Sequence, residues 1–288
     1  MTDIELTHQT VPTSYGDIAV AEAGPADAPV LVMLHGGGPG ASGEANYRHN
    51  LSALARTFRV LLPDQPGFGA SYRPTQDDLD EKSITQIHVD ALVEAFDTLG
   101  VDRFHLLGNS LGGATAIALA QQHRDRVSRL VLMAPGGGWL PFGPTPTEGQ
   151  KEMFRFFNGE GPTLKKMERF IGVMTAEPKR WADTAQARYE ASLDSSHVEF
   201  YHRLNAHFAK RHGMDPLWQR LHLIKAPTLL LWGRDDRTIT FEGAQIMLKY
   251  IRDVQLHVFG NCGHWVQLER QAEFERLVAD FLAEESLA

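Results

Sequence analysis

The residues with the clearest chemical potential lie in the stretch Gly108-Asn109-Ser110-Leu111-Gly112, which fits the pattern G-x-S-x-G. The stretch follows an apolar run typical of a strand and opens a segment typical of a helix, the setting in which this pattern presents a nucleophilic serine. Glycines are expected there because the serine occupies a strained turn with positive φ, where neighbouring side chains would collide. Small-residue turns of this kind also occur without a catalytic role, so the interpretation needs partner residues elsewhere.

Two later segments supply those partners. A serine hydroxyl becomes a good nucleophile only when a base removes its proton, and the base needs an acid to orient it. The stretch "WGRDDRT" holds Asp235 and Asp236, and the stretch "GNCGHW" holds His264, each directly after an apolar run. The order serine, aspartate, histidine is the one that accompanies this serine turn. We therefore predict a triad of Ser110, His264 and one of the two aspartates, between which the residue pattern does not choose.

A glycine-rich loop, His35-Gly36-Gly37-Gly38-Pro39-Gly40, follows an earlier apolar run. Acyl transfer needs backbone N–H donors aimed at the developing oxyanion, one from Leu111 after the nucleophile and one from such a loop. Gly36, Gly38 and Ala41 also satisfy the loose dinucleotide-binding pattern. That alternative lacks an acidic residue at the end of a strand ~20 residues later and lacks the Gly-Lys-Ser/Thr of a P-loop. The loop is therefore predicted to face an oxyanion and not a phosphate.

These candidates are positioned by short apolar runs that break at glycine or proline. The runs cover residues 29–36, 58–67, 103–110, 129–137, 227–236 and 254–264, with amphipathic stretches such as 84–99 and 114–123 between them. Continuous apolar runs of this length predict buried parallel strands with crossover helices. Before Pro29, the pattern favours two antiparallel strands around a Gly16-Asp17 turn. The predicted fold is α/β, with a mostly parallel central sheet flanked by helices.

The alternation stops between about residues 138 and 213. This segment is helical in pattern, rich in Phe, Met, Lys and Arg, and contains no convincing strand. We predict a helical lid over 138–213, inserted into a core domain made of 1–137 and 214–288. Trp139 and Phe142, where the chain passes from sheet to lid, are candidates for contact with a substrate.

The composition narrows the class of partner. The 288 residues are 43% hydrophobic with a net charge of −8 and no basic run, which argues against nucleic acid or a membrane surface as the main partner. The first residues lack the features of a signal peptide, and no run approaches the ~20 apolar residues of a membrane span. One cysteine, Cys262, permits neither an intrachain disulfide nor a thiolate zinc cluster. We expect a cytoplasmic protein without a metal site.

Four segments together resemble the meta-cleavage product hydrolases, which have the α/β-hydrolase fold: "HGGGPGASGEANY", "GNSLGG", "WGRDDR" and "GNCGHWVQLE". The resemblance to the fold extends over essentially the whole chain. It implies hydrolysis of a carbon–carbon bond in a vinylogous 1,5-diketone acid of the 2-hydroxy-6-oxo-hexa-2,4-dienoate type, in aromatic or steroid degradation. The small-molecule dienoate would give a 2-hydroxydienoate and a carboxylic acid. A homodimer or homotetramer is implied, and neither a metal nor an organic cofactor is called for.

The resemblance also implies roles for single residues. Ser110 would be the nucleophile and His264 the acid and base, with Asp236 orienting it, because the family pattern W-G-R-x-D places the acid there. Gly37 and Leu111 would donate the oxyanion hydrogen bonds. The predicted substrate-binding residues are Gly38, Asn46, Asn109, Arg188 and Trp265, with Arg188 facing the substrate carboxylate. A guanidinium suits that role because it offers a bidentate fork.

Other functions of the same fold stay open. A carboxylesterase or another serine hydrolase would keep the triad, and a ligand receptor of this fold could keep it with little turnover. An epoxide hydrolase or dehalogenase would carry aspartate in place of Ser110. A proline iminopeptidase shares a similar glycine-rich loop, but here a third glycine precedes Pro39.

Overall fold

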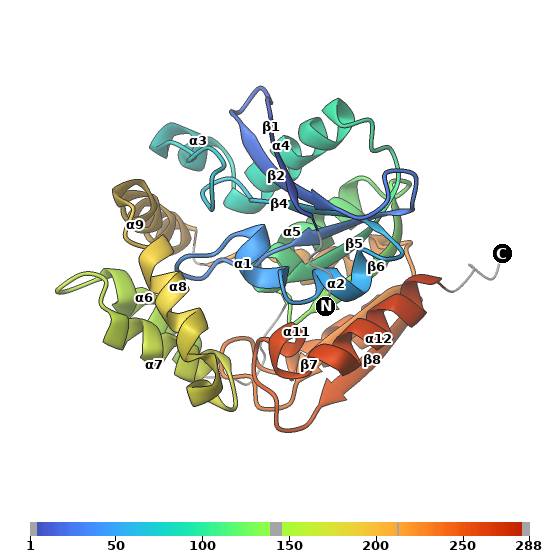
Figure 1. Ribbon diagram of the computed structural model, residues 1–288. Coiled ribbons are helices and arrows are strands. Elements are labelled where there is room, and N and C mark those ends of the chain that lie inside the picture. The colour runs from blue at the N-terminus through green and yellow to red at the C-terminus, as the bar shows by residue number, and fades with distance from the viewer. Residues whose placement is uncertain (1–4, 139–145, 212, 284–288) are drawn as a thin grey trace.

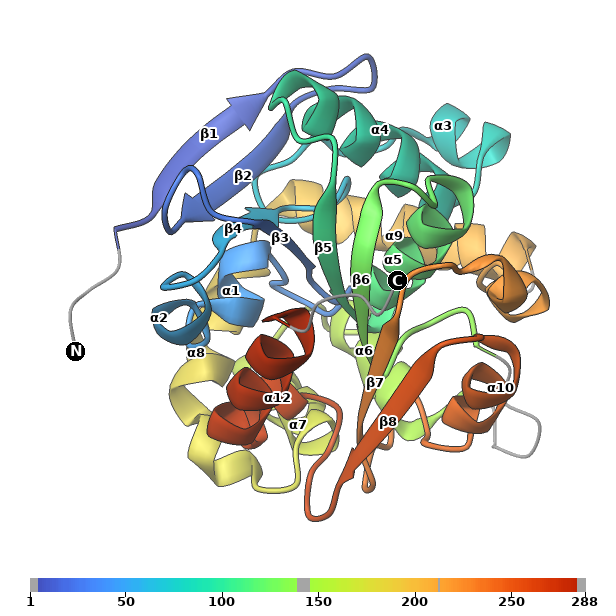
Figure 2. The same ribbon diagram turned by 90° about the vertical axis from the view of Figure 1, so that its right-hand side faces the viewer.

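The structure is a computed structural model of the chain, and it describes residues 5–138, 146–211 and 213–283. Its centre is an eight-stranded sheet with the order β1-β2-β4-β3-β5-β6-β7-β8 (Figures 1 and 2). The strands are β1 Thr7–Val11, β2 Ile18–Ala23, β3 Val30–Leu34, β4 Arg59–Pro63, β5 Phe104–Asn109, β6 Val127–Met133, β7 Thr228–Gly233 and β8 Val254–Phe259. The pairs from β4 to β8 are parallel, whereas β1 pairs antiparallel with β2 and β2 with β4. The predicted mostly parallel sheet with an antiparallel start is confirmed.

Helices cover both faces of the sheet, which is why its strands read as continuous apolar runs. One face packs on α4 (Ile84–Thr98), α5 (Ser110–Gln122), the 3₁₀ helix η2 (Leu217–Leu223) and α10 (Gly243–Tyr250). The other face packs on α1 (Gly43–Tyr47), α2 (Leu51–Leu54) and α12 (Gln271–Ala283). Neighbouring strand residues alternate between the two cores: Leu106 lies in the first and Leu107 in the second. Helix α5 begins at Ser110, as predicted for the serine turn, and includes most of the amphipathic stretch 114–123.

The described part of the segment between β6 and β7 consists of helices joined by loops. It contains α6 (Glu148–Phe157), α7 (Leu164–Met174), the 3₁₀ helix η1 (Pro178–Trp181), α8 (Ala182–Ala191) and α9 (Ser195–Lys210), and its described residues form no strand. Figure 1 shows these helices gathered on one side of the sheet. Phe156, Phe170 and Phe200 of this segment share a third apolar core with Leu111 and Trp265. The division into a core domain and a lid stays a prediction, and Trp139 and Phe142 lie outside the described residues.

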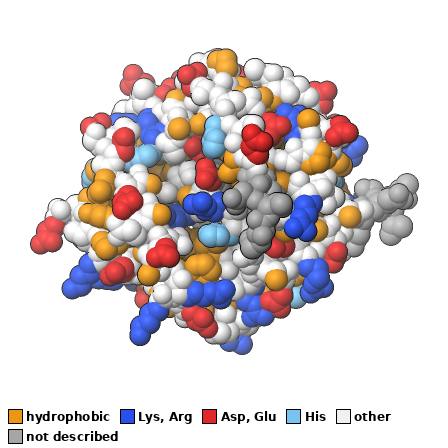
Figure 3. Space-filling view, viewed as in Figure 1, with side chains coloured by type: hydrophobic (Ala, Val, Ile, Leu, Met, Phe, Trp, Pro, Cys, Tyr) orange, Lys and Arg blue, Asp and Glu red, His pale blue; other side chains and the backbone are white. Residues whose placement is uncertain are grey.

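Two further helices complete the described chain, α3 (Gln76–Glu81) and α11 (Val266–Glu269). None of the helices in the described ranges combines the length and apolar character that a membrane span needs. The face seen in Figure 3 carries acidic and basic side chains interspersed with one another.

The topology explains how distant candidates meet. The glycine-rich loop follows β3, Ser110 follows β5, Asp236 follows β7 and His264 follows β8. The carboxyl ends of parallel strands lie at one edge of a sheet, where α/β proteins bind their ligands.

Candidate active site

Ser110 occupies a strained turn between β5 and α5. Its φ is 54°, which confirms the positive φ predicted for this position. A Cβ atom at Gly108 would lie 2.4 Å from the carbonyl oxygen of Gly112, and one at Gly112 would lie 2.4 Å from that of Leu34. Only glycine fits either position, so both glycines are required for the turn to pack against β3. The N–H of Leu111 lies in the first turn of α5, where backbone donors have no partner within the helix.

His264 and Asp236 form a buried pair. The distance from His264 Nδ1 to Asp236 Oδ2 is 2.6 Å, and the side chains are 2% and 0% exposed. The other carboxylate oxygen of Asp236 accepts hydrogen bonds from the backbone N–H groups of Thr238 (2.7 Å) and Ile239 (3.0 Å). The backbone N–H of His264 donates to the carbonyl of Met174 at 2.7 Å, which ties the histidine loop to the end of α7. Asp236 can therefore hold the imidazole in one orientation.

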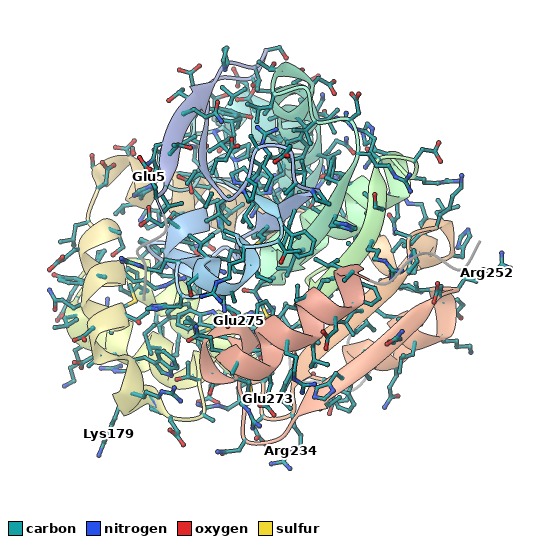
Figure 4. The ribbon with its side chains drawn as sticks, turned by 45° about the vertical axis from the view of Figure 1, so that its right-hand side comes forward. Glu5, Lys179, Arg234, Arg252, Glu273 and Glu275 are labelled. Atoms are coloured by element: carbon teal, nitrogen blue, oxygen red, sulfur yellow. The ribbon has the colours of Figure 1, made fainter. Side chains whose placement is uncertain are left out.

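Asp235 points elsewhere, although it is the neighbour of Asp236. Its exposed carboxylate lies 3.2 Å from Nε of Arg234. Arg234 lies at the outer edge of the molecule (Figure 4). This salt bridge lowers the pKa of Asp235. The structure thus distinguishes two aspartates that the residue pattern could not separate.

One small pocket brings most of the predicted residues together. Its walls include Gly37, Gly38, Asn46, Asn109, Ser110, Arg188, His264 and Trp265. No hydrogen bond joins Ser110 to His264 within this described site, and such bonds often form only once a substrate is bound. The open volume is ≈ 10 Å³, about that of one water-sized probe. The pocket is therefore nearly filled by the side chains that line it.

His35 fixes the start of the glycine-rich loop through hydrogen bonds. Its Nδ1 lies 2.8 Å from the carbonyl oxygen of Gly36, and its Nε2 lies 2.9 Å from the backbone nitrogen of Gln65. Because a carbonyl only accepts and a backbone N–H only donates, the ring must carry its proton on Nδ1 and be neutral. Burial lowers the pKa of His35, which agrees with this state. The side chain of Gln65 donates back to the His35 carbonyl at 2.6 Å.

The glycine-rich loop also contacts helices α8 and α9 and the first turn of α5. The hydroxyl of Tyr201, on α9, donates a hydrogen bond to the carbonyl oxygen of Gly37. A Cβ atom at Gly37 would lie 2.7 Å from Cδ2 of Leu111, so the two predicted oxyanion donors belong to residues in direct contact. At Gly40, where φ is 62°, a Cβ atom would lie 2.3 Å from the carbonyl oxygen of Arg188. The loop is therefore packed between the first turn of α5 and helices α8 and α9.

Arg188 is a buried cation at one end of the pocket. The side chain donates to Asn46 Oδ1 at 2.7 Å and to the Pro39 carbonyl at 3.3 Å, and it lies over the Trp265 ring at 4.6 Å. Arg188 is 3% exposed, and burial lowers its pKa to about 10, so the guanidinium is charged at neutral pH. Within the described part of the chain, no carboxylate pairs with it, and its Nε has no hydrogen-bond partner. A buried cation in this state is suited to an anionic ligand.

Asn109 and Asn46 lie side by side between Arg188 and the serine turn. Asn46 Nδ2 is 3.5 Å from Asn109 Oδ1, and Asn109 Nδ2 donates to the Met133 carbonyl at 3.1 Å. Both side chains are buried. Their orientations are therefore set by hydrogen bonds before a ligand arrives.

Sequence reasoning did not identify every residue of the site. Met153 and Thr238 line the pocket, and Tyr201 holds the loop, but none was assigned a role. Thr238 could have been found from its place two residues after Asp236. Met153 and Tyr201 lie on helices whose inward faces depend on packing, and no local pattern marks them. No group of His, Cys, Asp or Glu side chains in the described ranges could hold a metal ion.

Comparisons with known proteins agree on one family. A family profile described as the alpha/beta hydrolase fold matches residues 29–271. The 2-hydroxy-6-oxo-6-phenylhexa-2,4-dienoate hydrolase of Comamonas testosteroni is 37% identical over 265 residues, covering 91% of this chain and 89% of the relative. The 2-hydroxy-6-oxononadienedioate/2-hydroxy-6-oxononatrienedioate hydrolase 2 of Pseudomonas putida is 38% identical over 260 residues, covering 88% of each chain. The structure of a meta-cleavage product hydrolase from Pseudomonas fluorescens matches with a TM-score of 0.81 and 28% identity, covering 95% of this chain and 97% of that one.

Proposed function

The chain belongs to the alpha/beta hydrolase family, and within it to the meta-cleavage product hydrolases, and from this premise we propose that it hydrolyses a carbon–carbon bond in 2-hydroxy-6-oxo-hexa-2,4-dienoates. The observation that carries the proposal is the buried charge of Arg188, which has no carboxylate partner among the described residues and lies in the same pocket as Ser110 and His264. A dienoate carboxylate would pair with this buried cation, whereas a neutral ester would leave its charge without a partner.

The proposed reaction begins with proton transfer. The dienol of the substrate must become a ketone before the carbon–carbon bond can break, because the ketone accepts the electron pair that the bond releases. His264 is the proposed proton carrier, since an imidazole can both accept and donate a proton and Asp236 holds its ring at 2.6 Å. In this first step it takes the proton of the hydroxyl group and returns one to carbon.

Ser110 then acts as the nucleophile in our proposal. Its hydroxyl gives its proton to His264 as the oxygen attacks the remote carbonyl carbon, and the N–H groups of Gly37 and Leu111 stabilise the oxyanion that forms. When the tetrahedral intermediate collapses, the carbon–carbon bond breaks and its electron pair passes through the conjugated system to the oxygen of the C2 ketone. That oxygen takes the proton from His264, and the product leaves as the 2-hydroxydienoate. Water then hydrolyses the acyl-serine to a carboxylic acid, with His264 again moving the proton.

The carboxylate of the dienoate is the proposed ligand of Arg188. Its guanidinium, held by Asn46 and stacked on Trp265, can offer two N–H groups to the two carboxylate oxygens. Asn109 and Gly38 would lie along the dienoate between this end and the serine. A homodimer or homotetramer and a cytoplasmic location stay part of the proposal.

The test is the visible absorbance of 2-hydroxy-6-oxo-6-phenylhexa-2,4-dienoate, mixed with the wild-type protein and with Ser110→Ala. We expect the wild type to bleach the absorbance and release benzoate, and the variant to lose steady-state turnover. A wild type that leaves the dienoate intact but cleaves a p-nitrophenyl ester rapidly would contradict the proposal and identify a carboxylesterase. A wild type that binds the dienoate without cleaving it would instead support a receptor.

A further inference from the structure

The pocket has two chemically different ends. At one end, Arg188 contacts Asn46 and the carbonyl of Pro39. The other end is defined by Thr238, which shares the turn of Asp236 and donates its backbone N–H to that carboxylate at 2.7 Å. Ser110 and His264 line the same pocket, and the contacts of Arg188 and of Thr238 have no residue in common.

The end at Thr238 is apolar. Its hydroxyl lies 3.5 Å from Sδ of Met174, the last residue of α7. Helix α6 packs directly on this threonine, since a Cβ atom at Gly149 would lie 2.1 Å from its Oγ1. One turn further along α6, Met153 reaches the pocket wall. Two methionines and a threonine hydroxyl that already has a partner therefore define this end.

No cation is placed to serve the apolar end. Every lysine and arginine of the chain lies among the described residues, and Arg188 is the one that lines the pocket. Arg237 is the neighbour of Thr238, but its side chain is 46% exposed and lies 3.2 Å from the carboxylate of Glu148. It also donates to the carbonyl of Gly172, in α7. The stretch 139–145, outside the described residues, contains no charged side chain.

A carboxylate at the apolar end would be buried without a charge partner, which strongly disfavours binding. The relatives act on two kinds of substrate: a dienoate with a phenyl group, and dienedioates, which have a second carboxylate. We propose that this enzyme takes monocarboxylate dienoates whose remote carbonyl bears an apolar group, aromatic or alkyl, and that it discriminates against dienedioates. This inference rests on the proposed carbon–carbon hydrolysis in the same pocket. Met153, Met174 and Thr238 are the residues that determine the specificity.

The experiment compares kcat/KM of the wild type for 2-hydroxy-6-oxo-6-phenylhexa-2,4-dienoate and for 2-hydroxy-6-oxononadienedioate. We expect the monoacid to be preferred by about 100-fold, because a desolvated charge without a partner is so unfavourable. Equal turnover of the two compounds, or a preference for the dienedioate, would overturn this inference and leave the proposed reaction intact. Absence of turnover for both would overturn the reaction and the inference together.

Three variants locate the origin of the preference. Met153→Lys places a cation at the apolar end and should shift the ratio toward the dienedioate by at least about tenfold. Met153→Gln is the matched control: it adds polarity without charge and should give no such shift. Arg237→Gln should leave the ratio of the wild type unchanged. Turnover of the dienedioate that depends on Arg237 would show that this arginine reaches the pocket and would refute the assignment.

Discussion

Replacing Arg188 by methionine tests whether this residue binds the substrate or mainly stabilises the folded protein. Burial lowers the pKa of this arginine to about 10, well below the ordinary value of a guanidinium. A difference of that size corresponds to about 3 kcal/mol of destabilisation of the folded state. Because the folded-state pKa lies below the unfolded one, this unfavourable term is fully present at neutral pH and disappears only as the pH rises past both values.

Three contacts offset that term. Hydrogen bonds to Asn46 and Pro39 and the stacking on Trp265 each contribute about 1 kcal/mol. Their sum nearly equals the desolvation term, so Arg188→Met should change the free energy of unfolding by no more than about 1 kcal/mol. Loss of two charge-assisted hydrogen bonds to the substrate carboxylate should lower kcat/KM by about 100-fold.

The assay pairs urea unfolding with steady-state kinetics on 2-hydroxy-6-oxo-6-phenylhexa-2,4-dienoate. Arg180→Met is the matched control, because Arg180 is an exposed arginine that precedes the same helix. It should change neither quantity appreciably. A marked loss of stability in Arg188→Met together with nearly unchanged kcat/KM would show that Arg188 pins the helix to the loop and binds no carboxylate.

Two further predictions concern the orientation of the catalytic groups. Asp236→Asn should lower kcat by about 10⁴-fold, because an amide favours the wrong imidazole tautomer. Asp235→Asn, at an exposed position, should change kcat less than about twofold. Equal effects of the two substitutions would contradict the assignment of Asp236 as the residue that orients His264. Tyr201→Phe keeps the ring but leaves the Gly37 carbonyl without its donor, so kcat should fall about tenfold with little change in KM. A changed KM at constant kcat would place the role of Tyr201 in binding.

Much of the fold could be predicted because strand and helix patterns are local. The apolar runs predicted β3 to β8, and the turn residues Gly16 and Asp17 predicted the antiparallel pair before them. The start of α5 was predictable as well, because a serine turn of this kind opens a helix, and Ser110 is its first residue. The strained turn itself was predictable, since only certain residues tolerate its backbone angles.

The sequence by itself determined which residues could do chemistry and in what order they follow the strands. Residue chemistry could not choose between Asp235 and Asp236, and the resemblance to a family was needed to favour Asp236. The tertiary structure decided that Asp236 faces His264 while its neighbour faces solvent. It also decided that Arg188 is buried with no carboxylate partner in the described part of the chain, and that Tyr201 reaches the loop from α9. Such contacts join residues far apart in the chain, so they depend on how helices pack and not on any local pattern.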